Sequence, residues 1–141
     1  ARGLEVRTAV APGTPPVWAD PDQLARALAE LLANAADAYE AGGRVVVEAK
    51  LDDVTGQVLI RVVDTGRGMD AQTQENAFTP FFSAKAAGRR RGMGLSRARR
   101  LLQLASGKIW ISSAPGEGTT VFVLLPPAAG VTGSEAGEPR P

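Results

Sequence analysis

The 141-residue sequence contains no cysteine and no histidine, and each absence excludes a kind of chemistry. Without cysteine the chain has no disulfide framework and no thiol chemistry, which fits a reducing compartment and a cytoplasmic location. Without histidine, a reaction that needs an imidazole cannot be completed by this chain alone. No apolar run approaches the roughly 20 residues of a membrane span and no signal peptide is visible, so we expect no membrane contact by this domain itself. A net charge of +1 predicts no basic surface for nucleic acid.

What is present is the composition of one ordinary globular domain. Apolar residues make up 44% of the chain, and a chain of this length buries roughly 65–70% of its unfolded surface when it folds. We expect a single domain over residues 1–126. Residues 127–141 consist mainly of Pro, Ala, Gly and Glu, which predicts a disordered tail.

The hydrophobic periodicity predicts strands in alternation with helices. Asp20 is the expected N-cap of the first long helix, Pro21 its first residue, and Gly42-Gly43 its end. The order of elements predicts an α+β fold, a two-layer sandwich with helices on one face of a mixed, mostly antiparallel sheet. We expect strands at 4–10, 44–51, 57–63, 108–113 and 119–125, and helices at 21–39, 71–77 and 94–105.

The first long helix carries a polar stripe. Glu30, Asn34 and Asp37 are spaced i, i+4 and i+7, so at about 100° per residue their side chains lie on one face, largely away from the leucines. Helix propensity gives no reason for these residues within an Ala/Leu helix. Such a stripe of oxygen atoms suits a hydrated divalent cation and its phosphates. The alternative is a plain solvated helix face.

A glycine-rich turn follows the third strand at residues 64–69. Asp64 places an acceptor at the end of a buried strand, while Gly66 and Gly68 let the backbone approach a ligand closely. The exocyclic amine of a purine is a natural donor to this acceptor. The alternative is a simple turn, because Asp-x-Gly-x-Gly alone is common.

The segment before the last helix is rich in glycine and arginine. Gly92 and Gly94 lie where free backbone N–H groups and the positive end of the helix dipole suit a phosphate, and Lys85 adds charge. One alternative is a solvated basic loop. The other is a surface for an acidic partner, to which Arg97 and Arg100 would contribute.

Two further patterns are weak signals when each is taken alone. Residues 78–82 hold three of the four phenylalanines, which indicates either a satellite core or an aromatic hinge at one end of a mobile lid. Residues 116–120 read Gly-Glu-Gly-Thr-Thr, a turn whose hydroxyls enter a strand. Threonine is also an ordinary strand former.

Taken in order, these motifs resemble those of the ATP-binding domain of sensor histidine kinases. That domain belongs to the superfamily shared with DNA gyrase, the large heat-shock chaperones and mismatch-repair ATPases. The resemblance covers about residues 4–126 and implies the Bergerat-type ATP-binding fold. Residues 30–38 resemble the N box, 64–68 the G1 box, 78–82 the F box, 92–96 the G2 box and 116–120 the last glycine motif.

The resemblance implies that ATP and Mg²⁺ are bound by residues from these motifs. Asn34 is then a magnesium ligand, with Asp37 as support through water. Asp64 accepts from the adenine amine, helped by a water held near Thr119, and Lys85 contacts phosphate. The nucleotide-binding residues expected in this way are Asn34, Asp37, Asp64, Gly66, Gly68, Met69, Phe78, Gly92, Gly94, Leu95 and Thr119.

Glu30 departs from the pattern of many histidine kinases, which have asparagine there. A glutamate matches the ATP-hydrolysing branches of the superfamily, where it is the general base for water. We expect Glu30 and Lys85 to be catalytic. Glu30 could hold metal, polarise the acceptor or permit a slow hydrolysis.

The function implied is that of a protein-histidine kinase catalytic domain in a two-component system. It would bind ATP with Mg²⁺ and donate the γ-phosphate to a histidine on a separate dimerisation domain of the parent kinase. A response regulator would then receive the phosphoryl group from that histidine. Because this chain has no histidine, we expect no autophosphorylation by it alone. The alternatives are an anti-sigma-factor-type serine kinase, an ATP-gated conformational ATPase module, and a nucleotide-binding scaffold without turnover.

Overall fold

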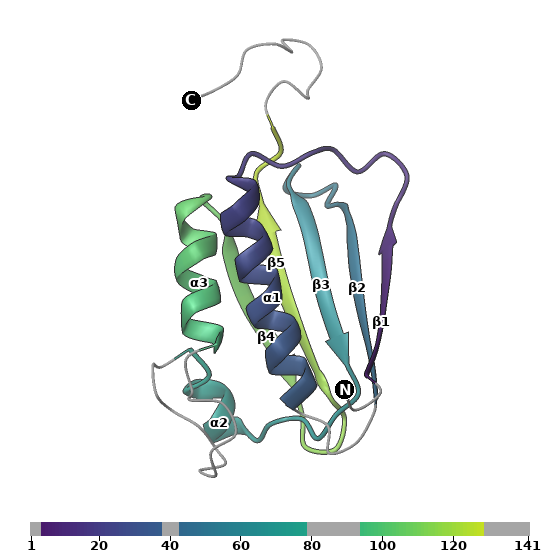
Figure 1. Ribbon diagram of the computed structural model, residues 1–141, viewed down its shortest axis with the longest axis vertical. Helices are drawn as coiled ribbons and strands as arrows, with labels where there is room; N and C mark the ends of the chain where they lie inside the picture. Colours follow the sequence, from purple (N-terminus) through teal and green to yellow (C-terminus); the bar gives the residue numbers. More distant parts are fainter. Residues whose placement is uncertain (1–3, 38–42, 79–93, 129–141) are drawn as a thin grey trace.

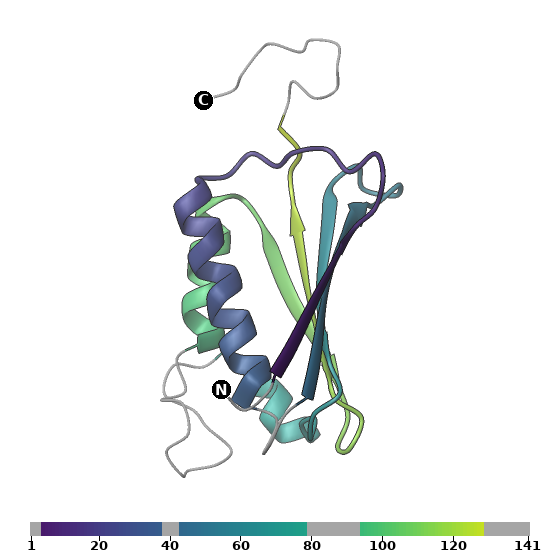
Figure 2. The same cartoon turned by 45° about the vertical axis from the view of Figure 1, so that its right-hand side comes forward.

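The structure is a computed structural model that describes residues 4–37, 43–78 and 94–128. Its strands form one sheet in the order β1-β2-β3-β5-β4, and Figures 1 and 2 show the two long helices on one face of that sheet. The expected two-layer α+β fold is confirmed. The elements are β1 (Leu4–Val10), α1 (Pro21–Asp37), β2 (Gly43–Leu51), β3 (Val58–Asp64), α2 (Ala71–Glu75), α3 (Gly94–Leu104), β4 (Lys108–Ser113) and β5 (Thr119–Leu125).

The sheet is mixed and mostly antiparallel, as the sequence predicted. β1 pairs with β2 in parallel, whereas β2–β3, β3–β5 and β5–β4 are antiparallel. The register pairs Asp64 of β3 with Thr119 of β5, and Thr119 with Ser113 of β4. Because paired residues on neighbouring strands point to the same side of a sheet, these three polar side chains form one row across the sheet.

The N-terminus of α1 is capped as the sequence predicted. One carboxylate oxygen of Asp20, Oδ1, accepts from the backbone N–H of Asp22 at 2.8 Å and of Gln23 at 3.2 Å. The carbonyl of Asp20 accepts the first helical bond, from Leu24 at 2.9 Å. This cap satisfies N–H groups that a helix cannot satisfy internally, so the start of α1 is fixed at Pro21.

The C-terminus of α3 is closed by a Schellman motif. The N–H of Gly107 donates to the carbonyl of Leu102 at 2.8 Å, and the N–H of Ser106 donates to the carbonyl of Gln103 at 3.0 Å. Ser106 has a φ of 63°, the left-handed conformation that this motif needs. The helix therefore ends one residue before the expected Ala105.

The core lies between the helices and the inner face of the sheet. From α1 it takes Ala27, Leu31 and Ala35, one turn apart and each at most 2% exposed. Because this apolar side faces the sheet, the predicted polar stripe is left on another side of the helix. The other buried residues of the core cluster are Val45, Val58, Ile60, Val62, Leu95, Ala98, Leu102, Val121, Val123 and Leu125.

Some element boundaries differ from the prediction. β2 begins at Gly43, one residue before the predicted strand, and Gly43 pairs with Leu4. Asp64 is the last residue of β3 instead of the first residue of a loop. The predicted end of the first helix at residues 38–39 lies outside the described residues.

The chain stays bonded to the domain slightly beyond the expected boundary at residue 126. Val17 forms a bridge with Pro127, and the N–H of Ala128 donates to the carbonyl of Pro16 at 2.8 Å. The remaining residues of the predicted tail, 129–141, lie outside the described part of the chain.

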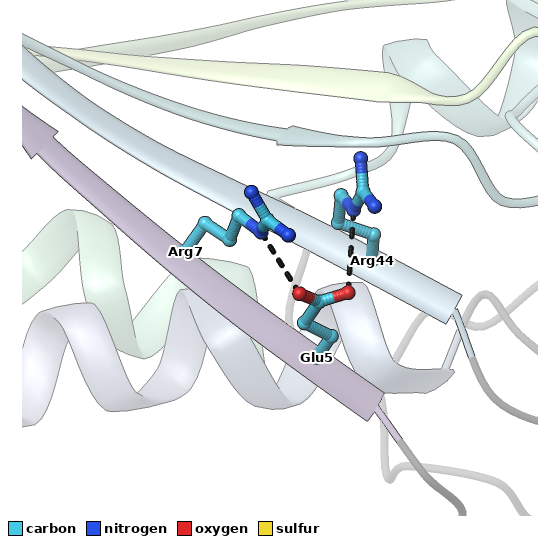
Figure 3. A network of polar contacts seen from close by, with 3 residues as sticks. All are labelled: Glu5, Arg7 and Arg44. Carbon is cyan, nitrogen blue, oxygen red and sulfur yellow. Dashed lines mark hydrogen bonds and ion pairs between the residues drawn. The ribbon is translucent and has the colours of Figure 1, made fainter.

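The edge of the sheet at β1 and β2 carries a small charge network (Figure 3). Glu5 accepts from Arg7 at 2.8 Å and from Arg44 at 3.4 Å, and the three side chains are about half exposed. The hydrogen bond from Arg7 and its charge lower the pKa of Glu5. Ion pairs this exposed contribute little to stability.

The predicted motifs converge at one end of the molecule. In Figure 1 the end of α1, the end of β3, the start of β5 and the short helix α2 all lie at the lower end. The first turn of α3 points toward the same end, whereas the hairpin turn between β2 and β3 lies at the opposite end. The fold therefore brings together residues from four separate parts of the sequence.

Candidate functional site

Asp64 is a nearly buried carboxylate at this end, with 4% of its surface exposed. One oxygen, Oδ1, accepts from the N–H of Gly66 at 2.8 Å and from the N–H of Thr119 at 3.3 Å. The other oxygen, Oδ2, has no hydrogen-bond partner in the described part of the chain. Burial raises the pKa of Asp64, while the two N–H groups and the charge of Arg67 oppose that shift. A buried acceptor without a donor is costly unless a ligand supplies one.

Two glycines hold the turn after β3 against the turn between β4 and β5. Gly68 has a φ of 72°, and a Cβ there would overlap the carbonyl oxygen of Ala114. Gly118 has a φ of 81°, and a Cβ there would overlap the carbonyl oxygen of Asp64. A third contact is the bond from the N–H of Gly116 to the carbonyl of Arg67 at 2.8 Å. Only glycine permits backbones to approach so closely in this conformation.

Ser113 joins the same two turns and was missed by the sequence reasoning. Its Oγ accepts from the N–H of Met69 at 2.8 Å and donates to the carbonyl of Gly118 at 2.8 Å. It also lies 2.7 Å from Oγ1 of Thr119. Pairing the two predicted strands residue by residue would have placed Ser113 beside Thr119. We call Asp64, Thr119, Ser113 and the backbone of residues 66–69 the sheet wall.

The backbone of Met69 is held from a second direction by α2. The Nε2 of Gln74 donates to the carbonyl of Met69 at 3.2 Å and to the carbonyl of Ser113 at 2.8 Å. Asp70 caps α2 by accepting from the N–H of Thr73 at 2.8 Å. Gly66, Gly68 and Met69 therefore sit in a turn that is bonded on both sides.

The polar stripe of α1 faces the start of α3. Both oxygens of Glu30 accept from Arg97, at 2.9 Å from Nε and 3.1 Å from Nη2. The hydrogen bond to Glu30 raises the pKa of Arg97. Asn34 is half-buried, and its side chain makes no hydrogen bond with the described residues. Asp37 is the last described residue of α1, and its side chain lies outside the description. We call Glu30, Asn34 and Arg97 the helix wall.

The oxygen atoms of the helix wall suit a cation that takes few ligands from the protein. No group of three or more acidic, His or Cys side chains that could hold a metal occurs within residues 4–37, 43–78 and 94–128. Mg²⁺ commonly takes only one or two protein ligands and completes its shell with phosphate oxygens and water. The amide oxygen of Asn34 fits such a role, whereas Glu30 is engaged by Arg97.

The remaining predicted residues divide into two groups. Phe78 packs against the core, and the guanidinium carbon of Arg99 lies 5.0 Å from its ring centroid, which supports the satellite-core interpretation. Gly94 opens α3, and Leu95 in its first turn is 6% exposed, with its side chain in the core. Lys85 and Gly92 lie outside the described residues.

Residues 19–129 match the family model described as "Histidine kinase-, DNA gyrase B-, and HSP90-like ATPase". The chain belongs to this family. The match spans both walls of the site, and it confirms the family resemblance that the motifs predicted.

Among curated relatives, the chain is 36% identical over 110 residues to the sensor histidine kinase ZraS of Salmonella typhi. That match covers 78% of this chain and 23% of ZraS, so the chain spans about a quarter of the length of that relative. Among solved structures it resembles the mycobacterial sensor histidine kinase MprB, with a TM-score of 0.74 and 28% identity over 88% of this chain and 82% of that one. It also resembles full-length ShkA in complex with AMPPNP, with a TM-score of 0.76 and 28% identity over 89% of this chain and 26% of ShkA.

These relatives support a histidine kinase catalytic domain of the ATP-binding type. One further observation concerns membranes. None of the helices in the described ranges is long and apolar enough to cross a bilayer.

Proposed function

We propose that this domain binds ATP with Mg²⁺ and donates the γ-phosphate to a histidine on a separate dimerisation domain of a two-component sensor kinase. A response regulator would then receive the phosphoryl group from that histidine. The observation that carries the proposal is Asp64, a carboxylate 4% exposed whose Oδ2 lacks a donor among the described residues. The amine of adenine supplies such a donor.

The sheet wall would bind the base. Asp64 and Thr119 stand side by side on paired strands, and both are at most 5% exposed. Hydrogen bonds from Gly66 and Thr119 fix the carboxylate through Oδ1, and Oδ2, which has no donor among the described residues, would accept from the ligand. Met69 is held in the adjoining turn, where its side chain would lie beside the purine.

The helix wall and the first turn of α3 would bind the phosphates. Asn34 would ligate Mg²⁺, with Asp37 supporting through water, and Mg²⁺ would neutralise charge on the β- and γ-phosphates. The first N–H groups of an α-helix lack intrahelical acceptors and suit a phosphate, which is the role proposed for Gly94 and Leu95. Gly92 and Lys85 are proposed for the same group of contacts.

Phosphoryl transfer depends mainly on how the protein positions the reacting groups, and this domain itself would form no covalent bond to phosphorus. The bond between the γ-phosphorus and the bridging oxygen breaks, ADP leaves with that electron pair, and an imidazole nitrogen forms the new bond to phosphorus. Because this chain contains no histidine, the imidazole must come from another domain. The chain alone is therefore expected to bind nucleotide without phosphorylating itself.

The experiment mixes this chain with a histidine-bearing dimerisation domain and ATP labelled at the γ-phosphate. We expect acid-labile phosphohistidine on the dimerisation domain and no label on this chain. Replacing the acceptor histidine with alanine should abolish the label. The kinase proposal is wrong if no candidate dimerisation domain is labelled, and phosphoserine on an acceptor would support the anti-sigma-factor alternative.

Glu30 carries the main alternative, an ATPase in which water accepts the phosphoryl group. A carboxylate at this position could act as general base for water. In this structure both of its oxygens are bonded to Arg97. Glu30→Gln separates the roles: loss of hydrolysis with intact phosphotransfer marks a base for water, whereas loss of both marks a role with metal or acceptor.

A further inference from the structure

Ser113 uses all of its hydrogen-bonding capacity within the protein. A serine hydroxyl has one proton and two lone pairs. The Oγ of Ser113 accepts from the N–H of Met69 and lies within hydrogen-bonding distance of the carbonyl of Gly118 and of the hydroxyl of Thr119. These three contacts leave nothing on Ser113 for a ligand.

The direction of each bond follows from what the partners can do. The carbonyl of Gly118 can only accept, so the proton of Ser113 points to it at 2.8 Å. The N–H of Met69 can only donate, and it occupies one lone pair of Ser113. The contact of 2.7 Å with Thr119 must therefore be a donation from Thr119 to Ser113. The proton of Thr119 is committed, and only its lone pairs remain.

This assignment turns the sheet wall into a surface of acceptors. Thr119 offers lone pairs and Asp64 offers Oδ2, from neighbouring positions on paired strands. Both residues are at most 5% exposed, so a mismatched group would lose its hydrogen bond without compensation from bulk water. Such a wall suits the hydrogen-bond donors of a base and rejects a carbonyl oxygen at the same place.

We propose that Ser113 is a specificity-positioning residue that makes this wall select a 6-aminopurine nucleotide over a 6-oxopurine nucleotide. This inference rests on the proposed function, in which the wall binds the base. Ser113 acts through Thr119 and does not touch the nucleotide. Without the Ser113 hydroxyl, Thr119 can turn its proton toward the ligand and donate to a 6-oxo group.

The test compares dissociation constants for ATP and ITP, which share their sugar and phosphates. The wild-type chain should prefer ATP strongly. In Ser113→Ala the ratio of the ITP dissociation constant to the ATP dissociation constant should fall by about tenfold. This is the effect expected when one group, the Thr119 hydroxyl, can donate a hydrogen bond to the ligand instead of only accepting one. It should stay above one, because Asp64 still presents only acceptors. Ser112→Ala is the matched control, since Ser112 is the adjacent serine on the opposite face of β4 and should leave the ratio unchanged.

A purely structural role for Ser113 predicts a different result. Loss of the bonds to Met69 and Gly118 would then weaken the binding of ATP and of ITP equally, and the ratio would not change. An unchanged ratio overturns the inference. ATP binding by the wild-type chain would still support the proposed function. Ser113→Thr keeps the hydroxyl and should keep the wild-type ratio. If Ser113→Ala does not fold, Thr119→Val is the second variant, because it removes the acceptor Oγ1 that Ser113 orients. It should lower the ratio similarly. An unchanged ratio in Thr119→Val overturns the inference. A wild-type chain that binds neither nucleotide overturns the proposed function and this inference together.

Discussion

The two walls of the site are held in different ways. In the sheet wall, Asp64 and Thr119 are 4–5% exposed and Ser113 is half-buried, and side-chain and backbone hydrogen bonds join β3, β5 and β4. The helix wall consists of an exposed ion pair between Glu30 and Arg97 beside the half-buried amide of Asn34. The sheet wall is preformed, and its acceptor Oδ2 of Asp64 has no donor among the described residues. The helix wall has its polar groups at or near the solvent.

This difference matches what each wall would bind. A base is a rigid, uncharged ring that is recognised by hydrogen bonds of fixed direction in a buried place. A magnesium–triphosphate group carries most of its own charge and brings its own water. We infer that the sheet wall sets which nucleotide binds, while the helix wall sets what happens to its phosphates.

Gly118→Ala should disrupt the sheet wall most. Its Cβ would overlap the carbonyl of Asp64 in a left-handed conformation, so the free energy of unfolding should fall by about 3 kcal/mol and nucleotide binding should be lost. Gly116→Ala is the control, because Gly116 has a φ of 76° but no atom within 4 Å of the added Cβ. It should cost about 1 kcal/mol. Equal losses in urea unfolding would mean that the two turns are not interlocked.

Asp64→Asn should weaken ATP binding while leaving the fold intact. Oδ1 already accepts from Gly66 and Thr119, so the asparagine oxygen should keep that place and its NH₂ should replace Oδ2. A donor then faces the amine, which should weaken ATP binding by about 10- to 100-fold in calorimetric titration. Unchanged affinity would exclude Asp64 from base recognition.

The same carboxylate should make stability depend on pH. Burial raises the pKa of Asp64 above its ordinary 3.8, so the folded state retains the proton to higher pH than the unfolded state. The stabilising contribution of Asp64 to the free energy of unfolding is therefore fully present below pH 3.8, and it is lost as the pH rises through the folded-state pKa. Urea unfolding of wild type and Asp64→Asn should show the variant gaining relative stability over this interval. Parallel curves would contradict the raised pKa.

Arg97→Gln should have the smallest effect on stability. The Glu30–Arg97 pair is bidentate, but Arg97 is 46% exposed, so its loss should lower the free energy of unfolding by about 1 kcal/mol or less. Raising the salt concentration should shrink the difference. A loss as large as that in Gly118→Ala would show that the helix wall is as rigidly built as the sheet wall.

Local patterns in the sequence were sufficient for much of the fold. The strands at 4–10, 108–113 and 119–125 were predicted with their observed bounds because apolar and polar residues alternate there. Asp20 was recognised as a cap from its place before Pro21. The start of β2 was predicted one residue late, because a glycine after a helix gives no local sign of a strand and its pairing with Leu4 is a tertiary contact.

The site was predicted less completely, since part of it depends on tertiary contacts. Asp64 and Thr119 were found through the motifs that contain them. Ser113 was missed because its importance comes from the register of β4 against β5. The partner of Glu30 could not be predicted, because Arg97 lies 67 residues away on a helix whose packing angle is set by the whole core. The roles assigned to Lys85, Gly92 and the side chain of Asp37 stay predictions.

The most direct test of this account follows both walls in one NMR titration. Adenosine should shift the backbone amide signals of Met69 and Thr119 and leave the side-chain amide of Asn34 unchanged. ATP with Mg²⁺ should shift all three. The account is contradicted if ATP with Mg²⁺ leaves Asn34 unchanged, or if the nucleotide shifts residues of the outer sheet face such as Trp110 instead of the sheet wall.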